Sequence, residues 1–184
     1  MPEFLARYFR PKPIDVDVVR GGLWTAVDAT AYAGEKAAYQ AALLDQYKIY
    51  VEMADRISAR RAVANGFFLS LNTATLTAAG ALWGSASLRS WLLFVPLCLL
   101  LAQTAAWFWI VRSYRQLNSA KYIVIGMIEE QLPASPYWRA EWQALGEGKD
   151  KALYWPLTHL EQWLPVILAV VYVLGFVVAV ALPR

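Results

Sequence analysis

The stretch DRISARRAVANGFFLSLNTATLTAAGALW, Asp55 to Trp83, decides the fold. Three arginines near its start give way to a segment without an ionisable side chain. That segment is long enough to cross a bilayer, since about 20 residues of helix span the hydrocarbon core. It nevertheless carries amide and hydroxyl side chains at Asn65, Ser70, Asn72, Thr73, Thr75 and Thr77. The sequence therefore predicts a spanning helix whose polar side chains need polar partners or water.

The composition of the whole chain is that of an integral membrane protein. Its 184 residues are 59% hydrophobic and include nine tryptophans, whereas soluble domains are about 45–50% apolar. The chain has one histidine, His159, and one cysteine, Cys98, so no Cys/His metal cluster can form within one chain. No set of nucleophile, base and acid forms a catalytic constellation. We therefore expect no enzyme activity, no cofactor and no metal site.

Two further apolar stretches, 91–111 and 163–182, join 63–83 as predicted transmembrane helices. Only the seven residues GSASLRS separate the first two, so these helices should form an antiparallel hairpin. Of the 17 lysines and arginines, 15 lie before the first span or between the second and the third. Such residues are retained in the cytoplasm. We therefore expect a cytoplasmic amino terminus and a carboxyl terminus on the opposite side of the membrane.

Both helices of the hairpin are predicted to continue into the cytoplasm. Residues 35–62 contain no proline and are rich in Ala, Leu, Gln, Glu and Lys, which favours a stalk helix continuous with the first span. Residues 112–162 are predicted to begin as a helix that stops before Pro133 and to continue as loops and a short helix. Residues 1–34 are expected to be an irregular cytoplasmic segment.

The stalk helix carries a row of side chains suited to assembly. Apolar and aromatic residues recur at alternating four- and three-residue steps, which is typical of a coiled-coil seam. This stalk seam consists of Leu43, Tyr47, Tyr50, Ala54 and Ile57. Counted from the inner membrane face, Asp55 of the stalk and Lys121 beyond the second span lie at similar depth. We therefore predict an ion pair between them.

Small and polar side chains fall on one side of the first span. At about 100° per residue, the positions that align are Gly66, Ser70, Thr73, Thr77 and Gly80, with Asn65 and Asn72 on the adjoining face. Small residues let helices approach closely, and amides or hydroxyls bond between helices. The stripe could pack against the chain's own spans, but these offer few polar side chains. We therefore predict an oligomer interface or a pore lining formed by Asn65, Gly66, Ser70, Asn72, Thr73 and Thr77.

Six basic residues gather near the inner ends of the first two spans, namely Arg56, Arg60, Arg61, Arg112, Arg115 and Lys121. Contact with anionic lipid headgroups is the first interpretation, and together with topology it accounts for the net charge of +3. The alternative is an anion-binding girdle in a ring of subunits, suited to phosphate or a nucleotide. An anionic cytoplasmic ligand therefore stays open, and nucleic acid is not an expected partner.

Three runs of the sequence resemble a known family. They are YKIYVEMADRISARRAVANGFFLSLNTA, IVRSYRQLNSAKYIVI and WRAEWQALGEGKDKALYWPLTHLEQWLP. Together they resemble the bacterial RipA-type octameric membrane proteins over residues 40–184. The resemblance implies a homo-octamer in the bacterial inner membrane, with phospholipid and other copies of the chain as partners. It implies no catalytic residues.

We therefore expect an all-α integral membrane protein with three spans that assembles as a homo-oligomeric ring. Its expected function is a gated pore or a membrane-perturbing effector, for example in stress or phage defence, with the first spans around the symmetry axis. One alternative is a non-conducting scaffold that organises lipids or partner proteins. Another is a module that binds an anionic second messenger through the basic residues.

Overall fold

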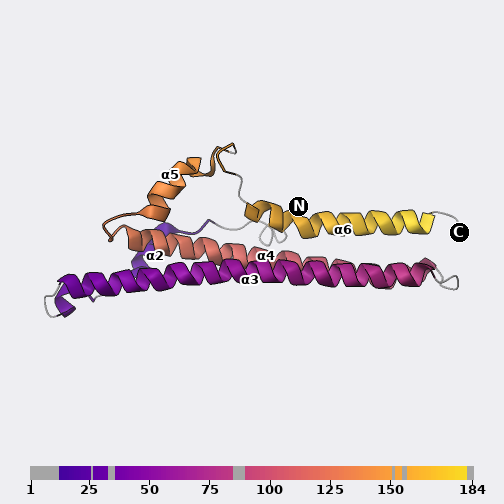
Figure 1. Ribbon diagram of the computed structural model, residues 1–184, viewed down its shortest axis with the longest axis horizontal. Helices are drawn as coiled ribbons and strands as arrows, with labels where there is room; N and C mark the ends of the chain where they lie inside the picture. Colours follow the sequence, from indigo (N-terminus) through magenta and orange to yellow (C-terminus); the bar gives the residue numbers. More distant parts are fainter. Residues whose placement is uncertain are drawn as a thin grey trace. The chain divides into compact units, whose positions relative to one another are not determined.

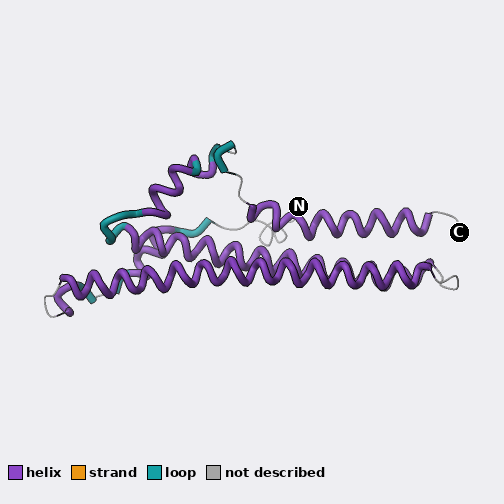
Figure 2. The backbone as a smooth tube through the Cα atoms, in the orientation of Figure 1, coloured by secondary structure: helices purple, strands orange, loops and turns teal. Residues whose placement is uncertain are grey.

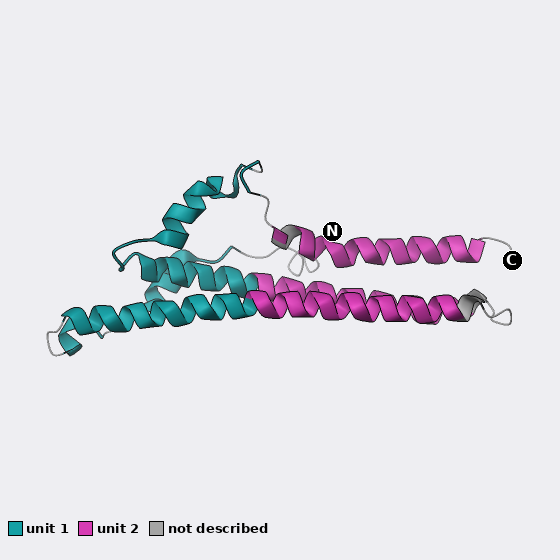
Figure 3. Cartoon of the chain, in the orientation of Figure 1, with its two compact units in different colours: residues 1–57, 116–155 teal, residues 58–115, 156–184 magenta. Residues whose placement is uncertain are grey.

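The computed structural model describes residues 13–25, 27–32, 36–84, 90–150, 152–154 and 157–181. These residues form helices, turns and loops, and they contain no strand (Figures 1 and 2). The chain divides into two compact units, coloured in Figure 3. Unit 1 comprises residues 1–57 and 116–155, and unit 2 comprises residues 58–115 and 156–184.

Two long helices each contribute residues to both units. Helix α3 (Lys36–Gly84) runs for 49 residues without a break, because no proline interrupts this part of the sequence. Helix α4 (Phe94–Glu129) has 36 residues. Pro96 falls in its first turn, where a missing backbone N–H costs no hydrogen bond. The stalk predicted from residue 35 onward and the first predicted span thus form one helix.

Two helices among the described residues are long and apolar enough to cross a membrane. They are α4 and α6 (Leu157–Ala181), whose most apolar parts have mean hydropathies of 1.9 and 2.8. Helix α3 is not among them, because Asn65, Asn72 and the nearby threonines lower its mean hydropathy. A third spanning helix therefore stays a prediction.

The amino-terminal part of unit 1 is more regular than the sequence suggested. Helix α2 (Val16–Leu23) begins at Asp15, whose Oδ1 accepts hydrogen bonds from the backbone N–H groups of Asp17 and Val18 at 3.1 and 3.3 Å. A 3₁₀ turn, η1 (Ala29–Tyr32), follows. The expectation of an irregular segment over 1–34 is thus wrong for these residues, because Asp15 caps a helix that the sequence analysis passed over.

Unit 2 is held together by aromatic packing between its helices. Phe68 of α3 and Trp107 of α4 stack with ring centroids 6.1 Å apart and planes 8° apart. Both are buried together with Val111, and Leu168 of α6 packs against this cluster. Phe94 of α4 also meets Phe176 of α6 edge to face, at 6.3 Å. Within hydrocarbon, such close packing replaces the hydrophobic effect as the force between helices.

After α4, unit 1 continues as short turns. One turn of π-helix, η3 (Pro136–Glu141), leads directly into α5 (Trp142–Ala144), and a 3₁₀ turn, η4 (Gly146–Gly148), follows. Gly146 and Gly148 have φ of 64° and 70°, a left-handed conformation that glycine adopts without steric cost. This part of the chain agrees with the predicted succession of loops and a short helix.

Candidate functional site

In unit 2, the face of α3 that meets α4 carries polar side chains with partners on the same chain. The indole Nε1–H of Trp107 donates a hydrogen bond to Asn65 Oδ1 at 2.8 Å. Gln103 Nε2 donates to Thr75 Oγ1 at 3.0 Å. Gln103 is among the few polar side chains expected on the second span, whereas Trp107 was not counted as a partner because only amide and hydroxyl groups were considered.

Asn72 is the most deeply buried polar residue of this face. Its side chain is 1% exposed, and its Nδ2 donates to the carbonyl of Phe68 on its own helix at 2.8 Å. Within the described part of the chain, its Oδ1 has no hydrogen-bond partner. In the single chain, Asn65 therefore bonds to α4 and Asn72 is buried, and their place at a symmetry axis stays a prediction.

We expect Trp107→Phe to weaken this contact, because it keeps the aromatic packing but removes the donor to Asn65. The free energy of unfolding in lipid or detergent should fall by about 0.6–2 kcal/mol, the usual range for an interhelical hydrogen bond in a membrane. Trp163→Phe is the matched control, since Trp163 is 61% exposed on α6. Equal stabilities for the two variants would show that the Trp107–Asn65 bond contributes nothing.

The remaining face of α3 in unit 2 presents the small and hydroxylated residues to the outside of the chain. This α3 stripe consists of Gly66, Ser70, Thr73, Thr77 and Gly80, and all five are exposed. The hydroxyls of Thr73 and Thr77 donate to carbonyls one turn back, those of Leu69 and Thr73, at 2.8 and 2.9 Å.

No part of the described chain covers the α3 stripe. A Cβ atom added at Gly66 or at Gly80 would meet no atom within 4 Å. The surface is therefore flat enough for close approach of another helix, and its threonine hydroxyls are satisfied within α3. Of the residues predicted for an interface, Gly66, Ser70, Thr73 and Thr77 lie together on this surface.

Two of the predicted basic residues connect to the start of α6. Arg61 of α3 forms an ion pair with Glu161, with 3.0 Å between Nε and Oε2 and side chains 15% and 30% exposed. Arg115 of α4 donates from Nη1 to Gln162 Oε1 at 2.7 Å. These contacts tie the first turns of α6 to both long helices, so these two side chains serve the fold of a single chain.

The other basic residues of this region have different surroundings. The guanidinium of Arg112 is 5.7 Å from the ring centroid of Trp109, and the residue is 6% exposed. Arg56 forms an exposed ion pair with Glu52 at 2.7 Å, and Arg60 is exposed. The six predicted basic residues are thus distributed among helix contacts, an aromatic ring and the surface.

We expect the Arg61–Glu161 pair to stabilise the docking of α6. A double-mutant cycle with alanine at each position should give a coupling energy of about 1 kcal/mol, because the pair is largely shielded from solvent. The Arg56–Glu52 pair is the control. Its side chains are 68% and 62% exposed, so its coupling should not exceed about 0.5 kcal/mol. Equal couplings would contradict this assignment.

The stalk seam faces the chain's own α4 in unit 1. Leu43, Ala54 and Ile57 are buried, and Tyr47 and Tyr50 are half-buried. Tyr47 contacts α4 directly, because its hydroxyl donates a hydrogen bond to Glu129 Oε1 at 2.9 Å. The seam stabilises the hairpin within one chain, and a role between chains stays a prediction.

Lys121 contacts a ring instead of the predicted carboxylate. Its Nζ lies 4.7 Å from the ring centroid of Tyr50 and 4.0 Å from the Sδ of Met53. No ion pair between the described residues joins Lys121 to Asp55. The predicted ion pair is therefore wrong. Similar depth along two helices does not make side chains meet unless they also share a face.

The sequence analysis missed the role of Glu129, the last residue of α4. Its carboxylate is 1% exposed. Besides Tyr47, it accepts from Ser135 Oγ at 2.7 Å and from the backbone N–H groups of Tyr137 and Trp138 at 3.2 and 2.9 Å. Burial, and then the hydrogen bond and charge of Glu129, raise the pKa of Tyr47. A carboxylate at the C-terminus of a helix is unfavourable with respect to the helix dipole. An acidic residue near the predicted end of this helix was therefore the one signal in the sequence that hydrogen-bond donors surround it.

The neighbouring Glu130 points elsewhere and forms an ion pair with Arg20 of α2 at 3.3 Å. The two carboxylates therefore do not act as a pair. Among the described residues, no group of three or more His, Cys, Asp or Glu side chains could hold a metal ion. The carboxylates of Glu129 and Glu130 thus make contacts within the chain, whereas the α3 stripe is left uncovered by the described residues.

A comparison with protein families matches residues 44–181 to the octameric membrane protein family (8xMP). The match includes the stalk from residue 44 onward, the α3 stripe, α4 and α6. No curated protein and no solved structure matches the chain. The match covers well over half of the sequence, and the two strongly apolar helices agree with a membrane location. The chain belongs to the octameric membrane protein family and is a homo-oligomeric membrane protein.

Proposed function

We propose that the octamer forms a gated path for ions or small solutes across the bacterial inner membrane, with the α3 stripes around its symmetry axis. The observation that carries this proposal is an exposed stripe of glycine and hydroxyl side chains on a helix packed along an apolar one. In unit 2, Trp107–Asn65 and Gln103–Thr75 bonds place α3 beside the apolar part of α4.

If α4 spans the membrane, the part of α3 beside it lies in the membrane too. Helix α3 is nevertheless less hydrophobic than α4 and α6. A lipid-facing position conflicts with this surface, because small and hydroxyl-bearing residues of spanning helices are typical of contacts between helices. Protein or water next to the α3 stripe removes this conflict. The strongly apolar α6, most of whose surface is exposed on the single chain, suits the lipid-facing position.

The distribution of basic residues gives the proposed orientation. Lysines and arginines cluster before the first span and between the second and the third, which favours a cytoplasmic location for unit 1. A cytoplasmic signal acting on unit 1 would then open the path. If the protein is a membrane-perturbing effector, its path would stay closed until stress or infection supplied the signal.

Reconstitution into planar bilayers tests this proposal. We expect stepwise conductance from the wild-type octamer, and we expect Thr73→Leu to lower it at least tenfold because the substituted side chain faces the axis. Gly175→Leu on α6 is the control and should conduct like wild type, since an added Cβ there meets no atom within 4 Å. Absence of conductance across voltages, pH values and lipid compositions would remove the pore.

A non-conducting scaffold is the second candidate, and one observation favours it. The hydroxyls of Thr73 and Thr77 are satisfied by backbone carbonyls of α3 itself, so the stripe can pack against other helices without water. In this case the axis would be closed or filled by lipid. Acyl-chain density on the axis of a structure determined in lipid would support the scaffold.

The anionic-messenger alternative has less support. Arg61 and Arg115 contact Glu161 and Gln162, so they are engaged in holding α6. Anionic lipid at the inner headgroup level remains the proposed contact of the exposed Arg60.

A further inference from the structure

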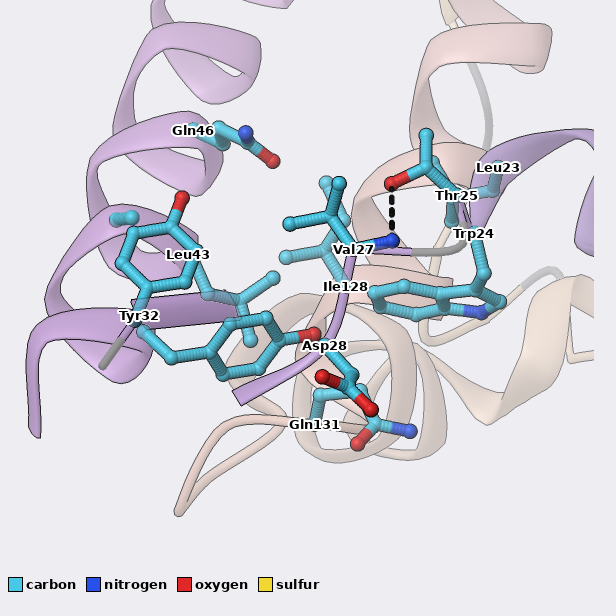
Figure 4. A pocket seen from close by; sticks show the side chains of 12 residues that line it. Leu23, Trp24, Thr25, Val27, Asp28, Tyr32, Leu43, Gln46, Ile128 and Gln131 are labelled. Carbon is cyan, nitrogen blue, oxygen red and sulfur yellow. Dashed lines mark hydrogen bonds between the residues drawn. The ribbon is translucent and has the colours of Figure 1, made fainter. Parts of the chain in front are cut away.

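Unit 1 contains a cavity of about 360 Å³ that no part of the proposed function uses. It lies between the residues that follow α2, the start of α3 and the end of α4 (Figure 4). Leu43 and Ile128, which are 6% and 3% exposed, contribute apolar lining. Gln46 and Gln131 add side-chain amides. The cavity therefore combines an apolar interior with polar groups, as small-molecule sites do.

Three aromatic side chains form much of its wall, namely Trp24, Tyr32 and Tyr39. The two tyrosine rings meet edge to face, with centroids 5.7 Å apart and planes inclined by 75°. Trp24 and Tyr32 are 37% and 36% exposed, so a ligand can reach them. Aromatic faces carry negative potential and attract cations, and tryptophan attracts them most strongly.

Asp28 contributes the one charged side chain among the described residues that line the cavity. In Figure 4 its carboxylate lies at the same end as Gln131 and the rings of Trp24 and Tyr32. Its Oδ1 accepts from the hydroxyl and the backbone N–H of Thr30 at 2.5 and 2.9 Å. These hydrogen bonds lower the pKa of Asp28. None of the ion pairs among the described residues includes this carboxylate.

We propose that this cavity binds a small soluble organic cation, of the alkylammonium or quaternary ammonium class. A carboxylate without a cationic partner beside perpendicular aromatic walls matches the two requirements of such a ligand, a counter-charge and π faces. The same carboxylate repels anionic ligands. The site does not depend on whether the assembly conducts ions.

The test uses the full chain, purified as its oligomer in detergent, and choline as the probe. Isothermal titration calorimetry should show saturable binding of choline. The neutral isostere 3,3-dimethyl-1-butanol, which has the same shape without the charge, should bind about two- to fivefold more weakly, given the strength of a cation–π contact at an exposed site. No saturable choline binding, or equal affinity for both compounds, would overturn the proposal.

Two substitutions assign the binding to this cavity. Asp28→Asn removes the charge but keeps an oxygen that can accept from Thr30, and Trp24→Leu removes the best aromatic face. Each should weaken choline binding by about two- to fivefold. Asp17→Asn, which changes an exposed carboxylate of α2 outside the cavity, should leave it unchanged. Choline binding that survives both cavity substitutions, or a cavity filled by a neighbouring copy in the oligomer, would also overturn the proposal.

Discussion

Replacing Glu129 by alanine is expected to lower the free energy of unfolding of unit 1 by about 3 kcal/mol, because four partly buried donors lose their acceptor and a fully buried donor without one costs about 1–3 kcal/mol. Four groups donate to this carboxylate, and two of them are the backbone N–H groups of Tyr137 and Trp138. The side chain of Trp138 also packs against Gly126 of α4, but the backbone of the turn is bonded to α4 through Glu129. Hydrogen exchange at residues 135–138 should therefore accelerate together with the loss of stability.

Glu130→Ala provides the matched control at the next position. Its ion pair with Arg20 is exposed, with side chains 51% and 26% accessible, so its loss should cost no more than about 1 kcal/mol. Exchange at residues 135–138 should stay slow in this variant. If the two alanine variants were equally stable, the carboxylate of Glu129 would not be the anchor of this turn.

The second large effect is expected from Gly66→Leu, which should convert the octamer into smaller species while each chain stays folded. An added Cβ at Gly66 meets no atom of its own chain within 4 Å, so a leucine fits the isolated fold. In the assembly the same side chain would separate helices that approach closely at small residues. Native mass spectrometry and light scattering in detergent measure the loss.

Gly175→Leu is the control, because it makes the same change on α6, where an added Cβ again has open space. This variant should remain octameric. Circular dichroism should show the same helix content for both variants. An octamer that persisted in Gly66→Leu would mean that the α3 stripe is not the close contact between copies.

Much of the helical architecture could be predicted from the sequence, because uninterrupted apolar and helix-forming runs determine it locally. The absence of proline over 35–62 and the apolar stretch over 63–83 predicted one continuous helix, and α3 spans Lys36–Gly84. The apolar run near the carboxyl end predicted α6 in the same way. Helix α2 was missed because its start depends on a single capping residue, Asp15.

The contacts between helices were harder to predict, because they depend on the rotation of each helix about its axis. Periodicity separated the α3 stripe from the rest of the span but did not say which side meets α4. Asn65 and Asn72 lie on the α4 side, and Lys121 meets Tyr50 and not Asp55. Consecutive residues of a helix point about 100° apart around its axis. The depth of a residue in the membrane therefore does not show which neighbour its side chain faces.

We expect the α3 stripe to contact other copies of the chain and not lipid. A small diazirine-bearing residue in place of Thr73, activated by light in native membranes, distinguishes the two. Covalent products between copies of the chain are expected from this position, and lipid adducts from the same residue in place of Gly175 on α6. Lipid adducts at Thr73 without any product joining two chains would mean that the stripe faces lipid.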